Sequence, residues 1–230
     1  AGSDAYFYKK SPSQTWAQGT WTRYATAPDT SLHYLGASLG SYYSAIYALA
    51  PCLKKLDNGT ERLAITCMTF RPTDGKTYAS TSDAYHECGY IYTDDKGTTW
   101  RKADGTALTL PISTATYSDA VLFPHTGGSY GYTGIAVAPD GTPTIAVDTF
   151  TTTGTNPVTK AHQGVTVYRW NGLSWESLVI DPDTSGGVEN PPYGRLASPK
   201  VLLDESGKAH VYSFCDDPPN KPYTALKHHV

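Results

Sequence analysis

Several histidine, tyrosine and arginine residues lie in glycine-rich segments between short runs of strand-forming residues. A histidine or a tyrosine phenolate can remove a proton, and a second tyrosine can return one to a leaving group. An arginine guanidinium binds a carboxylate through two parallel hydrogen bonds and stabilises charge that develops on it. The candidate catalytic residues are His125 or Tyr132 as the base, Tyr130 as the acid, and Arg195 or Arg71 as the cation.

A second set of residues has the side chains that a sugar-binding surface needs. Aromatic rings pack on the apolar C–H faces of pyranose rings, while polar tips reach the hydroxyls. Each tyrosine taken alone could instead cap the rim of a sheet, but the whole set favours binding of an acidic polysaccharide. The candidate substrate-binding residues are His33, Tyr42, Arg71, His162 and Tyr193.

The four cysteines leave three interpretations open. His86 and Cys88 are two apart on an expected strand, so both would face one side, and Cys67 on the preceding strand could join them. Thiolate and imidazole ligands suit a structural zinc site, although no fourth ligand is evident. A disulfide between Cys52 and Cys67, or buried reduced cysteines, are the alternatives.

Composition and charge exclude some classes of function. The net charge of −3 and the lack of a basic run argue against nucleic acid as a partner. No apolar stretch approaches the length of a membrane span. The even cysteine count and the glycosylation sequon at Asn58 predict a secreted protein.

Residues 93–100 carry the strongest local signal for structure. They fit the Asp-box pattern Ser/Thr-x-Asp-x-Gly-x-Thr-Trp, which forms a tight hairpin. The carboxylate of Asp95 accepts hydrogen bonds from nearby backbone N–H groups, and Gly97 supplies a positive φ. Trp100 is expected to close the turn against the neighbouring hydrophobic layer.

The box belongs to a repeated unit of strand, glycine turn, strand, variable loop, strand and box turn. Degenerate copies of the box end at Trp16 and Trp175, and glycine hairpins precede or follow them at Gly59, Gly141 and Gly207. The predicted fold is all-β, a single β-propeller domain of four-stranded blades over residues 1–230. The expected blades are two outer strands in 5–24, whole blades in 46–103 and 131–180, and two inner strands in 200–214.

Residues 89–112, with the box followed by Ala-Asp-Gly-Thr-x-Leu-x-Leu-Pro, resemble a segment of the BNR-repeat propellers that include ulvan lyases and related uronate-acting enzymes. The resemblance implies a seven-bladed ring, of which this chain holds about three blades. The remaining blades would then lie on another chain segment. The resemblance also implies action on acidic plant or algal polysaccharides, with a histidine or tyrosine as base and an arginine to neutralise the uronate.

The expected activity is therefore cleavage of a uronate-containing polysaccharide by β-elimination. One alternative is hydrolysis of rhamnose–glucuronate or sialic acid linkages, although a sialidase needs an arginine triad and arginine is scarce here. The other alternative is a lectin propeller without catalysis. Lectin propellers need near-equivalent pockets between blades, and the loops around Tyr42, Tyr130 and Tyr193 differ in length and composition.

Overall fold

The computed structural model describes residues 5–9, 11, 13–25, 45–70, 85–108, 128–153, 159–182, 199–215 and 225–230. In this part of the chain, fourteen strands form four antiparallel sheets, and the sole helical element is a 3-10 turn at Trp16–Gln18. None of its elements is a helix long and apolar enough to cross a membrane.

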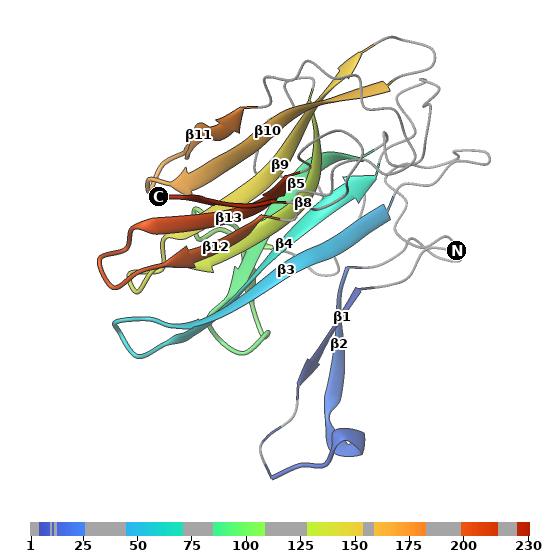
Figure 1. The fold of residues 1–230 in the computed structure, drawn as a ribbon. Coiled ribbons are helices and arrows are strands. Elements are labelled where there is room, and N and C mark those ends of the chain that lie inside the picture. The colour runs from blue at the N-terminus through green and yellow to red at the C-terminus, as the bar shows by residue number, and fades with distance from the viewer. Residues whose placement is uncertain are drawn as a thin grey trace, which may run out of the picture.

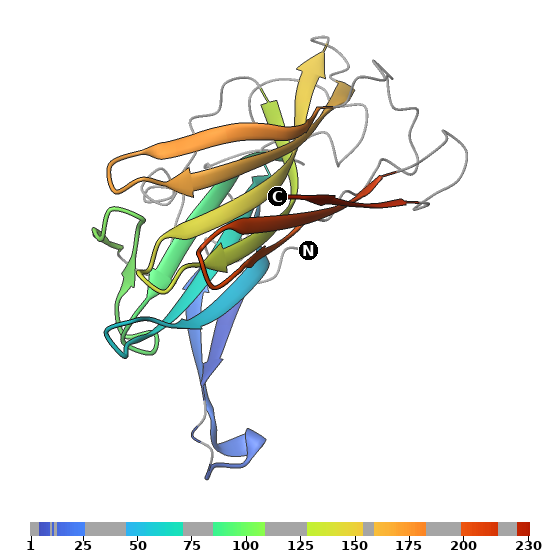
Figure 2. The same cartoon turned by 60° about the vertical axis from the view of Figure 1, so that its left-hand side comes forward.

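The four sheets follow one another along the chain (Figures 1 and 2). Sheet I pairs β1 (Ala5–Lys9) with β2 (Thr20–Ala25). Sheet II contains, in spatial order, β3 (Ala45–Lys55), β4 (Glu61–Phe70), β5 (Tyr85–Thr93), β6 (Trp100–Arg101) and β7 (Ala107–Leu108). Sheet III contains β8 (Gly128–Val137), β9 (Pro143–Thr153), β10 (Thr159–Trp170) and β11 (Trp175–Pro182). Sheet IV contains β12 (Lys200–Leu203), β13 (Ala209–Cys215) and β14 (Ala225–His229).

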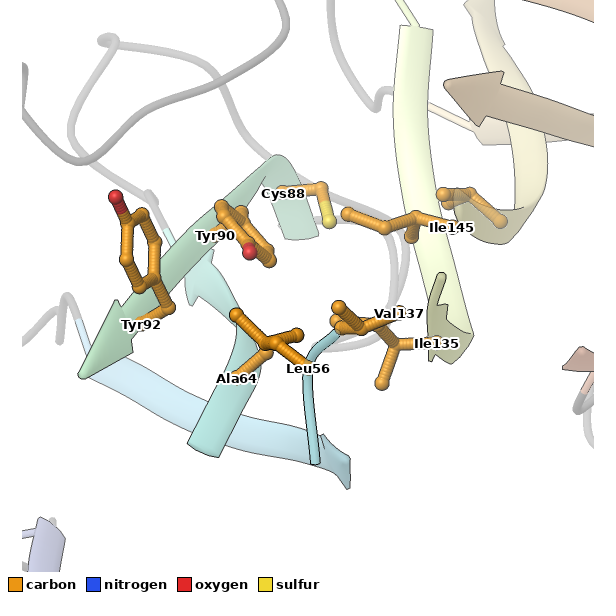
Figure 3. Close-up of a cluster of buried hydrophobic side chains, with 9 residues drawn as sticks. Leu56, Ala64, Cys88, Tyr90, Tyr92, Ile135, Val137 and Ile145 are labelled. Atoms are coloured by element: carbon orange, nitrogen blue, oxygen red, sulfur yellow. The ribbon is translucent and has the colours of Figure 1, made fainter. Parts of the chain in front are cut away.

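Sheet III packs between sheets II and IV, so it has a hydrophobic core on each face. The core between sheets II and III is the cluster drawn in Figure 3, where Tyr90 and Cys88 of β5 meet Ile145 of β9. The core between sheets III and IV joins Ala146 and Val165 to Val201 and Val211. Alternation along β9 explains the division, because successive residues of a strand face opposite sides of the sheet.

Sheets III and IV approach each other closely at Gly134 of β8. A Cβ atom on Gly134 would lie 2.3 Å from the carbonyl oxygen of Pro199 and 2.9 Å from Cα of Lys200. Both contacts are with backbone, which cannot rotate away as a flexible side chain could. The absence of a side chain at Gly134 is therefore what lets the two sheets meet at this spacing.

Short hairpin turns lie together at one end of sheets II, III and IV, which we call the turn end (Figure 1). Here the backbone N–H of Asp57 donates to the carbonyl of Pro139, at 2.9 Å, between the turns of sheets II and III. Arg62 of β4 donates from Nη1 to the carbonyl of Gly141 at 2.8 Å, and it binds both carboxylate oxygens of Asp94 at 2.7 and 2.8 Å. Its guanidinium also lies 3.8 Å above the ring of Tyr92. Sheets II and III are thus joined by hydrogen bonds at the turn end.

The turn at residues 93–100 has the hydrogen bonds expected of it. Asp95 Oδ1 accepts from the backbone N–H of Thr99 at 2.8 Å, and Thr93 Oγ1 accepts from the N–H of Gly97 at 2.9 Å. Gly97 has a φ of 86°, in the left-handed region that glycine adopts without strain. Trp100 follows the turn with its side chain 0% exposed.

Four aspartates in the turns, Asp95, Asp104, Asp140 and Asp204, have pKa values below the ordinary range of a carboxyl group. At Asp204 the main cause is the hydroxyl of Ser206, which donates to the carboxylate at 2.6 Å. The backbone N–H groups of Thr106 and Thr142 lower the pKa of Asp104 and Asp140 in the same way. At Asp95 burial raises the pKa, but hydrogen bonds from Thr99 and Thr93 outweigh it and the net shift is downward.

This pattern predicts loss of stability in acid. A carboxyl whose pKa is lower in the folded state stabilises the fold above its unfolded pKa of about 4, and that contribution disappears as the pH falls towards the folded value. The melting temperature should stay level from about pH 7 to 5 and decrease below about pH 4. Asp204→Asn should make the decrease shallower, while Glu205→Gln, a change at an exposed neighbour in the same turn, should leave it as in the wild type. Thermal unfolding followed by circular dichroism checks this, and equal acid sensitivity of the two variants would contradict it.

The all-β fold expected from the sequence is confirmed. Sheet III is the one described sheet with the expected four strands, because β7 extends sheet II to five strands and β14 extends sheet IV to three. Neither β7 nor β14 was anticipated from the repeat. The described sheets do not close into a ring, and the assignment of residues 1–230 to a single propeller domain stays a prediction.

Candidate functional site

The end of the sheets opposite the turns, which we call the loop end, is where the strand ladders become irregular. The register of β8 with β9 shifts between Tyr130 and Thr133, and that of β10 with β9 shifts between His162 and Gly164. In sheet II the register shifts between Ala48 and Ala50 of β3. Bulges of this kind bend a strand and redirect its side chains, and they are common beside functional sites.

Buried hydroxyls replace the apolar contacts between sheets II and III towards the loop end. Thr66 of β4 and Thr133 of β8 share a hydrogen bond of 2.6 Å across the interface, and both side chains are buried. On the same face of sheet III, Thr149 donates to the carbonyl of Gly164 at 2.9 Å and lies 3.1 Å from the hydroxyl of Thr166. This end of the interface is therefore polar and held by specific hydrogen bonds.

The interface between sheets III and IV also becomes more polar towards the loop end. Ala146 and Val211 belong to its hydrophobic core, and two residues nearer the loop end the same strands present Asp148 and Ser213. Both side chains are 1% exposed. Asp148 was not among the residues singled out from the sequence, although a carboxylate directly after the apolar run 145–147 is a signal that could have found it.

Three predicted site residues lie at the loop end of sheet III. Tyr130 pairs with Thr149, Tyr132 lies in the bulge of β8, and His162 pairs with Phe150 on the other side of β9. The register therefore brings the backbones of Tyr130, Tyr132 and His162 to the same end of one sheet. Their side chains lie outside the described part of the structure, so their roles stay predictions.

The other predicted site residues fall in segments that the structure does not describe. Their roles remain predictions. They are the candidate catalytic residues His125 and Arg195 and the candidate substrate-binding residues His33, Tyr42, Arg71 and Tyr193.

The backbone register of sheet II bears on the predicted metal site. Cys88 pairs with Met68 and Cys67 pairs with Gly89. The two cysteines therefore belong to adjacent residue pairs of the ladder and do not lie directly opposite each other. His86 is the extra residue of a register shift, because Glu87 pairs with Thr69 and Tyr85 with Phe70. The alternation that would bring His86 and Cys88 to one face is interrupted there. Among the described side chains, which do not include those of Cys67 and His86, no group of three metal ligands occurs. The zinc site stays a prediction.

The disulfide between Cys52 and Cys67 is not formed. Cys52 lies opposite Ala64 and is a free thiol, while Cys67 lies opposite Ala48. Disulfides need the two Cα atoms within about 7 Å of each other and their Cβ atoms directed towards one another. The hairpin places Cys52 and Cys67 three residues apart along the ladder, so its geometry does not bring them together.

A separate group of ionisable side chains lies on sheet IV near the turn end. His210 Nδ1 and His228 Nε2 are 3.0 Å apart, and His210 Nε2 is 3.3 Å from Asp204 Oδ2. The ring of His228 stacks on Tyr212 with centroids 4.6 Å apart. These contacts join β14 to β13 and to the turn that follows β12, and they are on the opposite end of the sheet from the polar loop end.

The fold and the site define a class: an all-β protein of stacked antiparallel sheets, tied at the turn end and polar at the loop end. The profile of the BNR repeat-containing family matches residues 51–181, more than half of the chain. The chain belongs to the BNR repeat-containing family. No curated protein matches the chain.

Two solved structures are similar in fold to this chain. One is an ulvan lyase described as a new family of polysaccharide lyase, with a TM-score of 0.61 and 16% identity. The other is the ulvan lyase bound to -[GlcA(1-4)Rha3S]-, with the same TM-score and identity. In both comparisons the match covers 94% of this chain and 45% of the other, so this chain spans less than half the length of those proteins.

Proposed function

We propose that the chain is part of a carbohydrate-active β-propeller that cleaves uronate-containing polysaccharide by β-elimination. The observation that carries the proposal is the gathering of Tyr130, Tyr132 and His162 at the polar loop end of sheet III. The similarity of fold to ulvan lyases supports the same class of substrate. In this proposal the box turn and the glycine hairpins belong to successive blades of one ring.

The chemistry follows from the acidity of the substrate. The base removes the proton α to the uronate carboxylate, the C–O bond to the neighbouring sugar breaks, and a proton passes to the leaving oxygen. The α proton is weakly acidic, so a cation must stabilise the negative charge that develops on the carboxylate. His125 or Tyr132 is the proposed base, Tyr130 the proposed acid, and Arg195 or Arg71 the proposed cation. The proposed substrate-binding residues are His33, Tyr42, His162 and Tyr193.

The product of the reaction provides the test. Elimination leaves a double bond conjugated to the uronate carboxylate, which absorbs in the ultraviolet, whereas hydrolysis adds water and leaves no such chromophore. The protein should generate ultraviolet absorbance from ulvan or a rhamnose–glucuronate polysaccharide. A neutral rhamnan should give no signal, because no acidic α proton is present. Absence of the chromophore across a panel of uronate polysaccharides would sink the lyase proposal.

The alternatives predict different products. A hydrolase acting on the same linkages releases saturated oligosaccharides. Each is heavier by one water than the unsaturated product, and mass spectrometry distinguishes the two. A lectin binds the polysaccharide on a glycan array and changes none of it. A secreted location and a structural zinc held by Cys67, His86 and Cys88 are further proposals, and metal analysis of the purified protein tests the second.

A further inference from the structure

We propose that Asp148 is a positioning residue of the uronate site, holding the bulge of β8 that carries Tyr132. This inference rests on the proposed function. Asp148 belongs to β9, the strand that pairs with β8 on one side and β10 on the other. Both neighbouring strands carry predicted site residues, so Asp148 lies between them in the sheet.

The ladder places Asp148 directly opposite the bulge. Tyr130 pairs with Thr149 and Thr133 pairs with Val147, which leaves Gly131 and Tyr132 facing the single residue Asp148. A bulge removes backbone groups from the regular ladder, and buried backbone groups need other partners. A carboxylate is the strongest hydrogen-bond acceptor that a protein side chain offers to such N–H groups.

Burial makes Asp148 costly as a purely structural residue. Its side chain is 1% exposed, and its partner on β10 is Val165, which is also 1% exposed. Burying a carboxylate opposes folding unless strong hydrogen bonds or charges compensate. Threonine or valine at this position would oppose folding less than a buried carboxylate, and Thr144 occupies such a buried position further along the same face of β9. A carboxylate at this position is explained by a requirement for exact placement of the bulge beside the site.

A second bulge lies at the same level of the sheet. His162 pairs with Phe150 and Gly164 pairs with Thr149, so Gln163 is an extra residue in β10. The unbulged strand β9 therefore runs between two bulged ones: Asp148 faces the bulge of β8, and the bulge of β10 begins at the next residue pair, Thr149 with Gly164. Relative to the regular strand β9, the bulges shift the backbone of β8 at Tyr132 and that of β10 next to His162.

The test compares Asp148→Asn with Thr144→Val. Thr144 lies on the same strand and face, is 2% exposed, and is near the turn end. Amide hydrogen exchange at Gly131 and Tyr132 should accelerate by about tenfold or more in Asp148→Asn and stay unchanged in Thr144→Val, because loss of an ordering hydrogen bond permits local opening. Below the melting temperature of both variants, kcat for elimination should fall by about tenfold in Asp148→Asn with KM unchanged, since positioning acts on the reacting groups rather than on binding.

Each outcome supports or overturns the inference about Asp148. Unchanged exchange at the bulge overturns the inference whatever the activity, and so does a wild-type kcat in Asp148→Asn. An equal loss of kcat in Thr144→Val at the same melting temperature would assign Asp148 a structural role alone. If the wild type performs no elimination, the proposed function fails, and the site role of Asp148 fails with it even where the exchange result holds.

Discussion

Replacing Trp100 with alanine should reduce the free energy of unfolding by roughly 3–5 kcal/mol, the usual cost of removing a large buried aromatic side chain. The indole is 0% exposed and follows directly after the turn at residues 93–100. Its backbone pairs with Leu108, which is itself buried, so the cavity would open near the β6–β7 edge of sheet II. Since whole domains are stable by only about 5–15 kcal/mol, a large share of the total would be lost.

Chemical denaturation with guanidinium chloride measures this change directly. Leu173→Ala is the matched control, because Leu173 is an apolar residue in the hairpin turn before Trp175 and is 90% exposed. The control should change stability by less than about 0.5 kcal/mol. A Trp100→Ala variant that loses less than about 1 kcal/mol would show that the indole fills no essential volume.

Replacing Arg62 with alanine should cost about 2 kcal/mol, less than for a fully buried ion pair, because the side chains of Arg62 and Asp94 keep 14% and 30% of their exposure. The change removes both hydrogen bonds to Asp94, the hydrogen bond to the carbonyl of Gly141, and the contact with the ring of Tyr92. Arg62→Lys should recover little, since an ammonium group cannot bind the carboxylate through two parallel hydrogen bonds.

A double-mutant cycle with Asp94→Ala separates the ion pair from the other contacts. The coupling energy between Arg62 and Asp94 should be about 1 kcal/mol, and it should persist in high salt because the pair is partly buried. Arg169→Ala, at an exposed arginine of β10, is the control and should stay within about 0.5 kcal/mol. A coupling energy near zero would leave the hydrogen bond to Gly141 as the main contribution of Arg62.

The sequence predicted best the features that local chemistry determines. The turn at residues 93–100 depends on the hydroxyl of Thr93, the carboxylate of Asp95 and the flexibility of Gly97, and all three can be read from residue types. The hairpins at Gly59, Gly141 and Gly207 were found for the same reason, and each of these glycines has a positive φ. The conformation of these turns is determined by residues close together in the sequence, so it can be predicted without knowledge of the tertiary fold.

Features that depend on register were harder to predict. The expectation that His86 and Cys88 share a face assumed strict alternation and did not include the register shift at His86 in β5, so it stays a prediction. The disulfide between Cys52 and Cys67 failed because the offset between hairpin arms cannot be read from composition. Asp148 was missed because its burial arises from the packing of sheet III against sheet IV, a contact between segments far apart in the sequence.

Hydrogen bonds join sheets II and III at two levels. Asp57 bonds to Pro139 and Arg62 to Gly141 at the turn end, and Thr66 bonds to Thr133 towards the loop end. The apolar contacts around Ile145 lie between the two levels. Hydrogen bonds depend on direction as well as distance, so sliding one sheet along the other would break contacts at both levels. The two sheets are therefore locked in a single relative register, which apolar contacts alone would not determine.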